Sequence, residues 1–142
     1  KRSTINIAQF AQTGIGLPER DYYFKTDSST RSIQQAYRTY LIRLFELIGT
    51  EPATARKNAT VVYAIEKQLA TAHRTNIERR DVKANYNKVA VTTLARKQPA
   101  LRWGALLTDL GVRADSVNVA QPAYYDQLNT LLTAVSIPDW FT

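Results

Sequence analysis

Residues 31–49 read RSIQQAYRTYLIRLFELIG, and this stretch predicts the fold class. Its large apolar residues recur at steps of three and four, which places them on one face of a helix. They are Ile33, Tyr37, Tyr40, Leu41, Leu44, Leu47 and Ile48. Residues 27–30 offer N-cap side chains before the helix, and Gly49 suits the position just past its end. We therefore expect a long amphipathic helix from about Arg31 to Ile48.

A second helix is predicted to follow after a short linker. Pro52 suits its first turn, and the helix should end near His73 or Arg74. Its inner stripe comprises Val62, Ile65, Leu69 and Ala72. Because the linker is short, an antiparallel helix pair is the simplest packing.

The remaining segments predict shorter elements. Further helices are expected over residues 91–97, 101–110 and about 122–135, the last of them ended by Pro138. Short strands are expected over residues 4–10 and at Val117–Val119, where apolar residues alternate, whereas residues 75–88 are expected to be irregular. The predicted fold class is mainly α: a helical lobe with one or two short strands, forming one domain or one lobe of a domain.

Composition limits the classes of protein and site. The chain has 142 residues, enough for one compact domain or a large piece of one. It has no cysteine, which excludes disulfides and cysteine metal sites. It has no methionine either, so we expect it to be processed or excerpted from a longer protein. No run approaches the roughly 20 apolar residues of a membrane span, and no signal-peptide pattern opens the chain.

The residues alone predict no catalytic or metal site. His73 is the single histidine, whereas a catalytic zinc needs about three protein ligands. The carboxylates of Glu19 and Asp21 flank Arg20, which favours an ion pair over an acid–base dyad. His73 is therefore interpreted as a helix-end residue. Without a further motif, the chain is typical of a helical structural or interaction module.

The formal net charge of +7 keeps a second function open. The excess cations gather in the middle of the chain: Arg74, Arg79, Arg80, Lys83, Lys88, Arg96, Lys97 and Arg102. A basic helical module that binds nucleic acid or an anionic protein partner is the alternative hypothesis. No zinc-finger spacing, Gly-rich phosphate loop or RNP motif accompanies the charge, so a solvated or domain-facing basic surface is favoured.

Residues 14–24, GIGLPERDYYF, are interpreted as a structural corner. The two glycines allow a close backbone turn, and Pro18 stiffens it. Arg20 and Asp21 are expected to pair locally. The three aromatic residues 22–24 are expected to anchor the loop against the first helix.

This corner resembles the GLPxRDYY segment of the neprilysin-type zinc metallopeptidases, which include the endothelin-converting enzymes and the bacterial oligopeptidase O group. The resemblance continues in order along roughly residues 5–135. EKQLA at 66–70 resembles the E-x-x-LA end of the family's next helix. The later motifs of the family then follow in the same order: RD…YNK, a leucine matched by Leu94, a tryptophan, and V-x-V…P-x-Y. The structural signature comprises Gly16, Leu17, Pro18, Arg20, Asp21, Tyr22, Tyr23, Arg80, Asp81, Tyr86, Asn87, Lys88 and Trp103.

The resemblance implies that the whole of 1–142 is one fragment of the amino-terminal, helical domain of a two-domain zinc peptidase. In that family this domain covers the catalytic domain, encloses a chamber and limits substrates to modest peptides. The family's zinc ligands lie in HExxH and ExxxD motifs of the carboxy-terminal part, and neither motif occurs here. The expected cofactor is thus none in this fragment and zinc in the parent. The expected partners are the rest of the polypeptide and, for the parent, peptide substrates.

Two features of the chain refine that expectation. Ala90 stands where a threonine often follows YNK-x in the family, which implies a weaker helix cap. The cysteines of the animal enzymes are missing, which implies a bacterial member, located in the periplasm or elsewhere outside the cytoplasm.

Overall fold

The computed structural model describes residues 6–140, which form two compact units. The first unit combines the segment ending at Thr13 with residues 76–134. The second combines residues 14–75 with the segment that begins at Val135. Each unit is described by itself.

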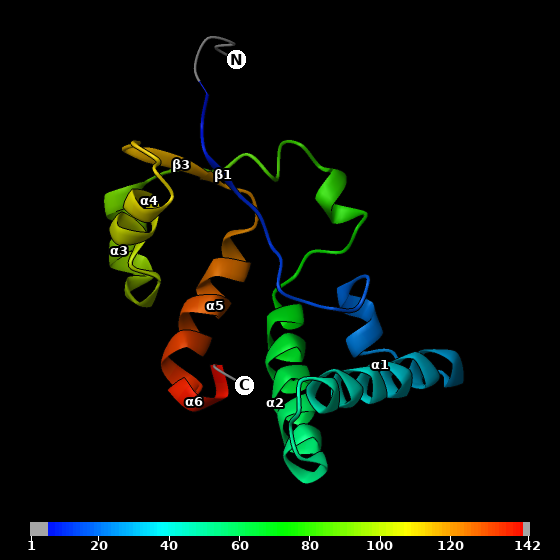
Figure 1. Cartoon of the computed structure of the whole chain (residues 1–142). Helices are drawn as coiled ribbons and strands as arrows, with labels where there is room; N and C mark the ends of the chain where they lie inside the picture. Colours follow the sequence, from blue (N-terminus) through cyan, green and yellow to red (C-terminus); the bar gives the residue numbers. More distant parts are fainter. Residues whose placement is uncertain (1–5, 141–142) are drawn as a thin grey trace. The chain divides into compact units, whose positions relative to one another are not determined.

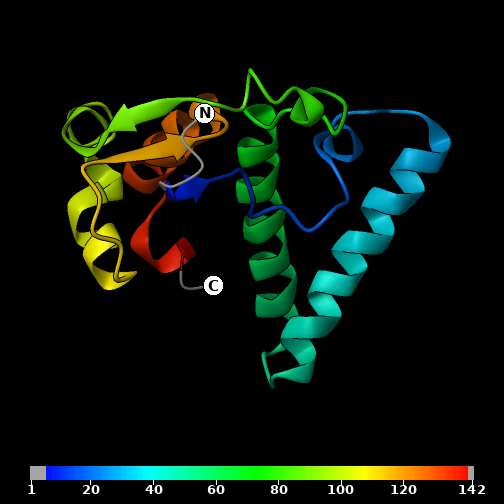
Figure 2. The ribbon, with the colours of Figure 1, turned by 90° about the horizontal axis from the view of Figure 1, so that it is seen from above.

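The second unit is built on two long helices, α1 (Ser28–Leu47) and α2 (Pro52–Thr71). They form a splayed antiparallel pair joined by a tight turn, as Figure 2 shows. Gly49 permits this turn because its φ is +89°, in the left-handed region that favours glycine. The predicted helix pair is therefore present. The 3-10 turn η1 (Arg20–Tyr23) and the short helix α6 (Ile137–Trp140) complete the unit.

The core of the second unit corrects the predicted stripe of α1. It comprises Leu17, Tyr23, Leu41, Ala59, Tyr63 and Ala70, with Tyr37, Ile42 and Phe45 packed against it. Five members of the predicted stripe are instead between 37% and 82% exposed: Ile33, Tyr40, Leu44, Leu47 and Ile48. The apolar face of α1 is thus wider than the surface that α2 covers.

The first unit holds a three-stranded sheet with the order β1-β3-β2 (Figure 1). Its strands are β1 (Gln9–Phe10), β2 (Lys88–Ala90) and β3 (Ser116–Val119). The central strand β3 pairs in parallel with β1 and antiparallel with β2. The helices of this unit are α3 (Val91–Lys97), α4 (Trp103–Asp109) and α5 (Pro122–Ala134), with 3-10 turns η2 (Glu78–Arg80) and η3 (Pro99–Leu101).

The mainly helical class is confirmed, and several boundaries differ from the prediction. The sheet has three strands rather than one or two, because Lys88–Ala90 pairs with β3. Lys88 is the last residue of the stretch expected to be irregular, and residues 89–90 lie between the predicted elements. The strand expected over 4–10 is seen only at Gln9–Phe10, and residues 4–5 lie outside the described residues.

Several helix ends also differ from the prediction. Helix α1 begins at Ser28 rather than about Arg31, and α2 ends at Thr71 rather than near His73 or Arg74. The fourth helix begins at Trp103 rather than residue 101, after Arg102 with a positive φ of 47°. The last long helix ends at Ala134. Pro138 does not end it but lies inside the short helix α6, where a first-turn proline lacks only an N–H that needs no helical partner.

Candidate functional site

The corner is held by the hydroxyl of Tyr23, a side chain that is only 1% exposed. This oxygen accepts hydrogen bonds from the backbone N–H groups of Gly16 and Leu17, both at 3.1 Å. It donates to Oε2 of Glu66 on α2 at 2.8 Å. One side chain therefore closes the loop on itself and attaches it to a helix more than forty residues away in the sequence.

Glu66 is shared by two tyrosines. Its second oxygen, Oε1, accepts from the hydroxyl of Tyr37 on α1 at 2.8 Å. Burial, and then the nearby Glu66 carboxylate, raise the pKa of both Tyr23 and Tyr37 well above the usual tyrosine value. Both hydroxyls thus stay protonated and can donate. We call Gly16, Leu17, Tyr23, Tyr37 and Glu66 the tyrosine–glutamate network.

The two glycines of the corner serve different purposes. Gly14 has a φ of +80°, so it supplies the turn that was expected. Gly16 is needed for space, because a Cβ at this position would overlap the hydroxyl oxygen of Tyr37.

Arg20 has a longer-range role than the predicted local ion pair. Its Nε lies 4.0 Å from Asp21, at the limit of an ion pair, and Asp21 is closer to Lys25, at 3.3 Å. The Nη1 of Arg20 donates to the backbone carbonyl of His73 at 3.1 Å. A cation near a helix C-terminus can satisfy the last carbonyl groups of the helix. This general preference is the reason from which the contact could have been expected. His73 is itself buried just past the end of α2.

The aromatic residues of the corner were predicted to pack on the first helix, and this prediction is only partly right. The buried one, Tyr23, packs on Tyr63 of α2, with ring centroids 5.5 Å apart. Phe24 is partly exposed, and the Lys67 ammonium lies 5.7 Å from its ring centroid. The first helix is engaged through backbone, since Gln34 donates to the carbonyl oxygens of Tyr22 and Lys25.

In the first unit, side-chain amides join the sheet to the RD…YNK segment. Asn118 in β3 is 4% exposed; its Oδ1 accepts from the N–H of Asn87 at 2.6 Å, and its Nδ2 donates to the carbonyl of Asn85 at 3.0 Å. Gln121 donates to Oδ1 of Asn85 and accepts from the N–H of Gln12. Asn87 is thus tied to the central strand, and Asn118 and Gln121 are contacts that the sequence did not reveal.

The other residues of the RD…YNK segment lie at the surface. Asp81 accepts from the N–H groups of Lys83 and Ala84, which makes it a local turn-forming residue. Arg80, Tyr86 and Lys88 are exposed. Asn87, through its hydrogen bonds to Asn118 and Ala120, and Lys88, through its pairing with β3, are therefore the members of this segment with long-range structural contacts.

Trp103 is fully buried in the first unit. Its indole N–H donates to Gln98 at 3.0 Å, and Gln98 donates in turn to the Asp126 carboxylate on α5 at 2.6 Å. The ring lies 5.1 Å from Phe10 and 5.4 Å from Tyr125, between centroids. The tryptophan thereby links β1, η3 and α5.

The side chains described between residues 6 and 140 do not fit a zinc ion. Over that range no group of three or more His, Cys, Asp or Glu side chains is arranged to bind a metal. We therefore derive no catalytic step from these residues. Within the same range, no helix combines the length and apolar character needed to cross a bilayer.

Comparison with known proteins decides the family. Residues 1–141 match the model of "Peptidase family M13". The chain belongs to peptidase family M13. The resemblance of the corner and of the motifs that follow it is thereby confirmed, and the match falls on an amino-terminal segment of the family.

The M13 chain is similar to mammalian relatives over a small part of their length. It is 33% identical to human endothelin-converting enzyme-like 1 over 112 residues, which is 78% of this chain and 14% of the relative. It is 29% identical to human endothelin-converting enzyme 1 over 139 residues, which is 93% of this chain and 18% of the relative. The chain thus spans less than a fifth of these curated relatives.

Solved bacterial structures share the fold of this M13 segment. The open state of the Mycobacterium tuberculosis zinc metalloprotease Zmp1 matches with a TM-score of 0.84 and 32% identity, over 93% of this chain and 21% of that one. PepO of Lactobacillus rhamnosis matches with a TM-score of 0.81 over 95% of this chain and 22% of that one. Its identity is 17%, so that likeness concerns the fold alone.

Proposed function

We propose that this chain is a non-catalytic part of the amino-terminal domain of a zinc-dependent metallopeptidase that cleaves oligopeptides. In this proposal the segment is the helical lid that restricts substrate size. The observation that carries the proposal is the similarity of nearly the whole chain to a mycobacterial zinc metalloprotease, at 32% identity and a TM-score of 0.84. All of 1–142 would then be one fragment of the lid domain.

The use of the signature residues supports a structural role. The polar side-chain atoms of three signature residues form hydrogen bonds within their own units: those of Tyr23, Asn87 and Trp103. The zinc ion and its ligands would belong to residues outside this chain. We further propose that the parent is bacterial, which the absence of the animal enzymes' cysteines supports, and that it acts outside the cytoplasm.

The decisive experiment compares the whole protein with the 142-residue chain on a short fluorogenic peptide, with and without a zinc chelator. We expect chelator-sensitive cleavage by the whole protein and none by the chain alone. A whole protein that cleaves nothing would overturn the peptidase assignment, and chelator-sensitive cleavage by the chain would overturn its non-catalytic status.

The lid role needs a separate measurement. A series of peptides with one scissile sequence and increasing flanking length should show a steep fall in kcat/KM with length. Equal cleavage of the shortest peptide and of an unfolded protein carrying the same sequence would contradict size restriction by a lid.

We propose no nucleic-acid partner for the basic segment. Glu78 and Asp81 stand among its cations in the sequence, and no nucleic-acid motif accompanies them. A labelled oligonucleotide titrated at low salt should show no change in anisotropy. Salt-sensitive binding would favour the alternative of a basic binding module.

A further inference from the structure

One edge of α1 carries an apolar stripe that the described residues of its unit cover only in part. We call Ile33, Tyr40, Leu44, Leu47 and Ile48 the outer stripe. Leu47 is 82% exposed, Ile48 78% and Tyr40 55%, whereas Ile33 and Leu44 are 37% and 39% exposed. Single exposed apolar residues are ordinary, but here four follow helical spacing in α1 and the fifth, Ile48, is its C-cap residue.

The outer stripe borders the side of α1 that packs on α2. Leu41 is buried in the core, and Tyr37, Ile42 and Phe45 pack against that core. The apolar face of α1 therefore extends beyond the surface that α2 covers. An exposed apolar margin of this length needs a reason, since the uncovered part of an amphipathic helix is normally polar.

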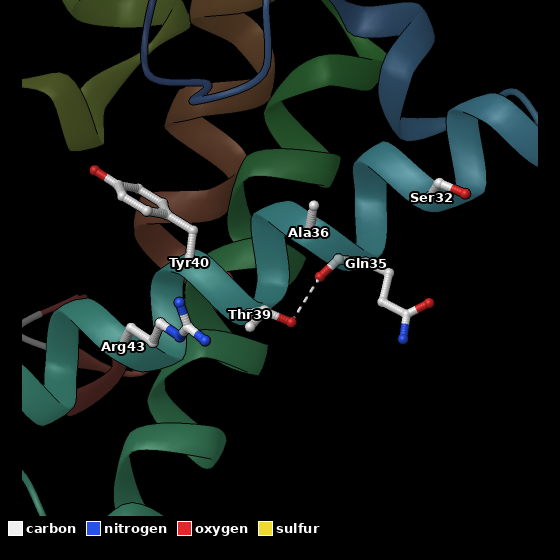
Figure 3. A pocket seen from close by; sticks show the side chains of 6 residues that line it. All are labelled: Ser32, Gln35, Ala36, Thr39, Tyr40 and Arg43. Carbon is white, nitrogen blue, oxygen red and sulfur yellow. Dashed lines mark hydrogen bonds between the residues drawn. The ribbon is translucent and has the colours of Figure 1, made fainter.

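The surface beside the stripe is open and includes three short side chains, those of Ser32, Ala36 and Thr39. Figure 3 shows an open hollow on α1 whose lining comes from that helix alone: Ser32, Gln35, Ala36, Thr39, Tyr40 and Arg43. The Thr39 hydroxyl is turned back onto the Gln35 carbonyl at 3.1 Å, so it presents no free donor. Short side chains beside an apolar stripe allow a second helix to approach closely.

We propose that the outer stripe is buried, in the whole protein, by a helical segment of the same polypeptide that lies outside residues 1–142. This inference rests on the proposed function in one respect, namely that the chain is part of a longer peptidase. The chain covers only 21% of the mycobacterial structure it matches, so in a protein of that size most of the polypeptide is available as the occupant.

Interface size favours the same polypeptide over a second copy. A stable interface between separate proteins buries about 800 Å² on each partner, more than five partly exposed side chains of one helix present. A covalently linked segment needs less area, because the linkage raises its effective concentration.

Charge narrows the chemistry of the occupant. Helix α1 carries Arg31, Arg38 and Arg43 but a single acid, Glu46. Arg38 already lies over the Tyr63 ring, 4.1 Å from its centroid. Arg43 borders the hollow and forms no ion pair with the described residues. The occupant should thus be an apolar helix face with a carboxylate placed to meet Arg43.

Site-specific photo-crosslinking of the whole protein tests the proposal. Benzoylphenylalanine replaces Leu47 in one variant and Tyr40 in another, and cross-linked peptides are mapped by mass spectrometry. We expect both probes to cross-link within one monomer to the same segment outside residues 1–142, and to lose this cross-link in urea. Products confined to residues 1–142, products with a second copy or with an added peptide substrate, or no product would each overturn the proposal.

Thiol protection gives a second readout. The chain has no cysteine, so Leu47→Cys places a single thiol in this segment. In the folded whole protein its alkylation should be at least about tenfold slower than in urea. Equal rates would overturn the proposal. Neither readout uses activity, so failure of the peptidase assignment and failure of this inference are distinguishable.

Discussion

At the scale of single residues, the corner depends on one hydroxyl and one missing side chain. The Tyr23 oxygen serves three partners at once, two backbone N–H groups and the Glu66 carboxylate. Gly16 leaves the space that the Tyr37 hydroxyl fills. Both residues belong to the GLPERDYY signature, so its conspicuous composition has a physical basis in packing and hydrogen bonding.

Tyr23→Phe should destabilise the chain. It removes the acceptor of two N–H groups and a donor to Glu66, and each buried group left unpaired costs about 1–3 kcal/mol. Urea unfolding monitored by circular dichroism measures the loss. The matched control is Tyr22→Phe, because the Tyr22 side chain is half-buried and the hydrogen bonds of Tyr22 in the described structure come from its backbone N–H and carbonyl. Equal stability of the two variants would contradict the role assigned to the Tyr23 hydroxyl.

Two glycine substitutions should have opposite effects. Gly16→Ala forces the Tyr37 ring to move and should destabilise by about 1–3 kcal/mol, as overpacking does. Gly104→Ala adds a methyl group to open space in α4 and should stabilise by up to about 1 kcal/mol. Thermal unfolding of both variants measures these effects. An unchanged Tm for Gly16→Ala would show that the close approach of Tyr37 to Gly16 does not contribute to stability.

At the scale of elements, the two long helices begin with carboxylate caps. Asp27 accepts from the Thr30 N–H at 2.9 Å and from its hydroxyl at 2.7 Å. Glu51 accepts from the N–H groups of Ala53 and Thr54. These hydrogen bonds, which stabilise the charged forms, lower the pKa of Asp27 below 3.8 and that of Glu51 below 4.5.

The caps predict an acid-dependent loss of stability. A carboxyl whose pKa is lowered by folding stabilises the folded state at pH values above its pKa in the unfolded chain, near 3.8 for Asp27. This contribution disappears as the pH falls through the pKa of the folded state. The Asp27→Asn variant should therefore have a lower Tm than the wild type at pH 6. The two Tm values should converge as the pH falls below the pKa of the Asp27 carboxyl in the unfolded chain. Glu46→Gln, near the opposite end of α1, serves as the control. A difference for Asp27→Asn that does not depend on pH would refute the cap assignment.

Strand β3 depends on a buried amide as much as on its valines. Asn118→Leu should destabilise the chain because the Asn87 N–H and the Asn85 carbonyl lose their partners, at about 1–3 kcal/mol for each group left buried and unpaired. Asn58→Leu on α2, at a half-buried position, is the control of equal chemistry. Hydrogen exchange should show faster exchange at Asn87 in the Asn118 variant, and unchanged exchange there would argue against the network.

At the scale of the whole molecule, the expectation that this chain binds no metal of its own can be tested. No group of metal-binding side chains occurs between residues 6 and 140. The Tm of the 142-residue chain should therefore be the same before and after dialysis against a chelator. A fall in Tm that added zinc reverses would reveal a metal site in the segment and contradict the zinc-free assignment.

The sequence by itself determined the helical class, the helix pair and the family. Periodicity placed α1 and α2, because apolar spacing and capping residues are local properties of a chain. The ordered signature from Gly16 to Trp103 was sufficient for the resemblance, which the match over residues 1–141 confirms. These conclusions needed only the order of residues.

Only the tertiary structure decided which apolar residues of α1 are core and which form the outer stripe. Spacing defines a face of a helix, but the partner that covers the face comes from elsewhere in the chain, and α2 covers only the side of Leu41. The same holds for Glu66, Asn118 and the third strand. Their hydrogen bonds join residues far apart in the sequence, and long-range pairing leaves no periodic trace in the segments it joins.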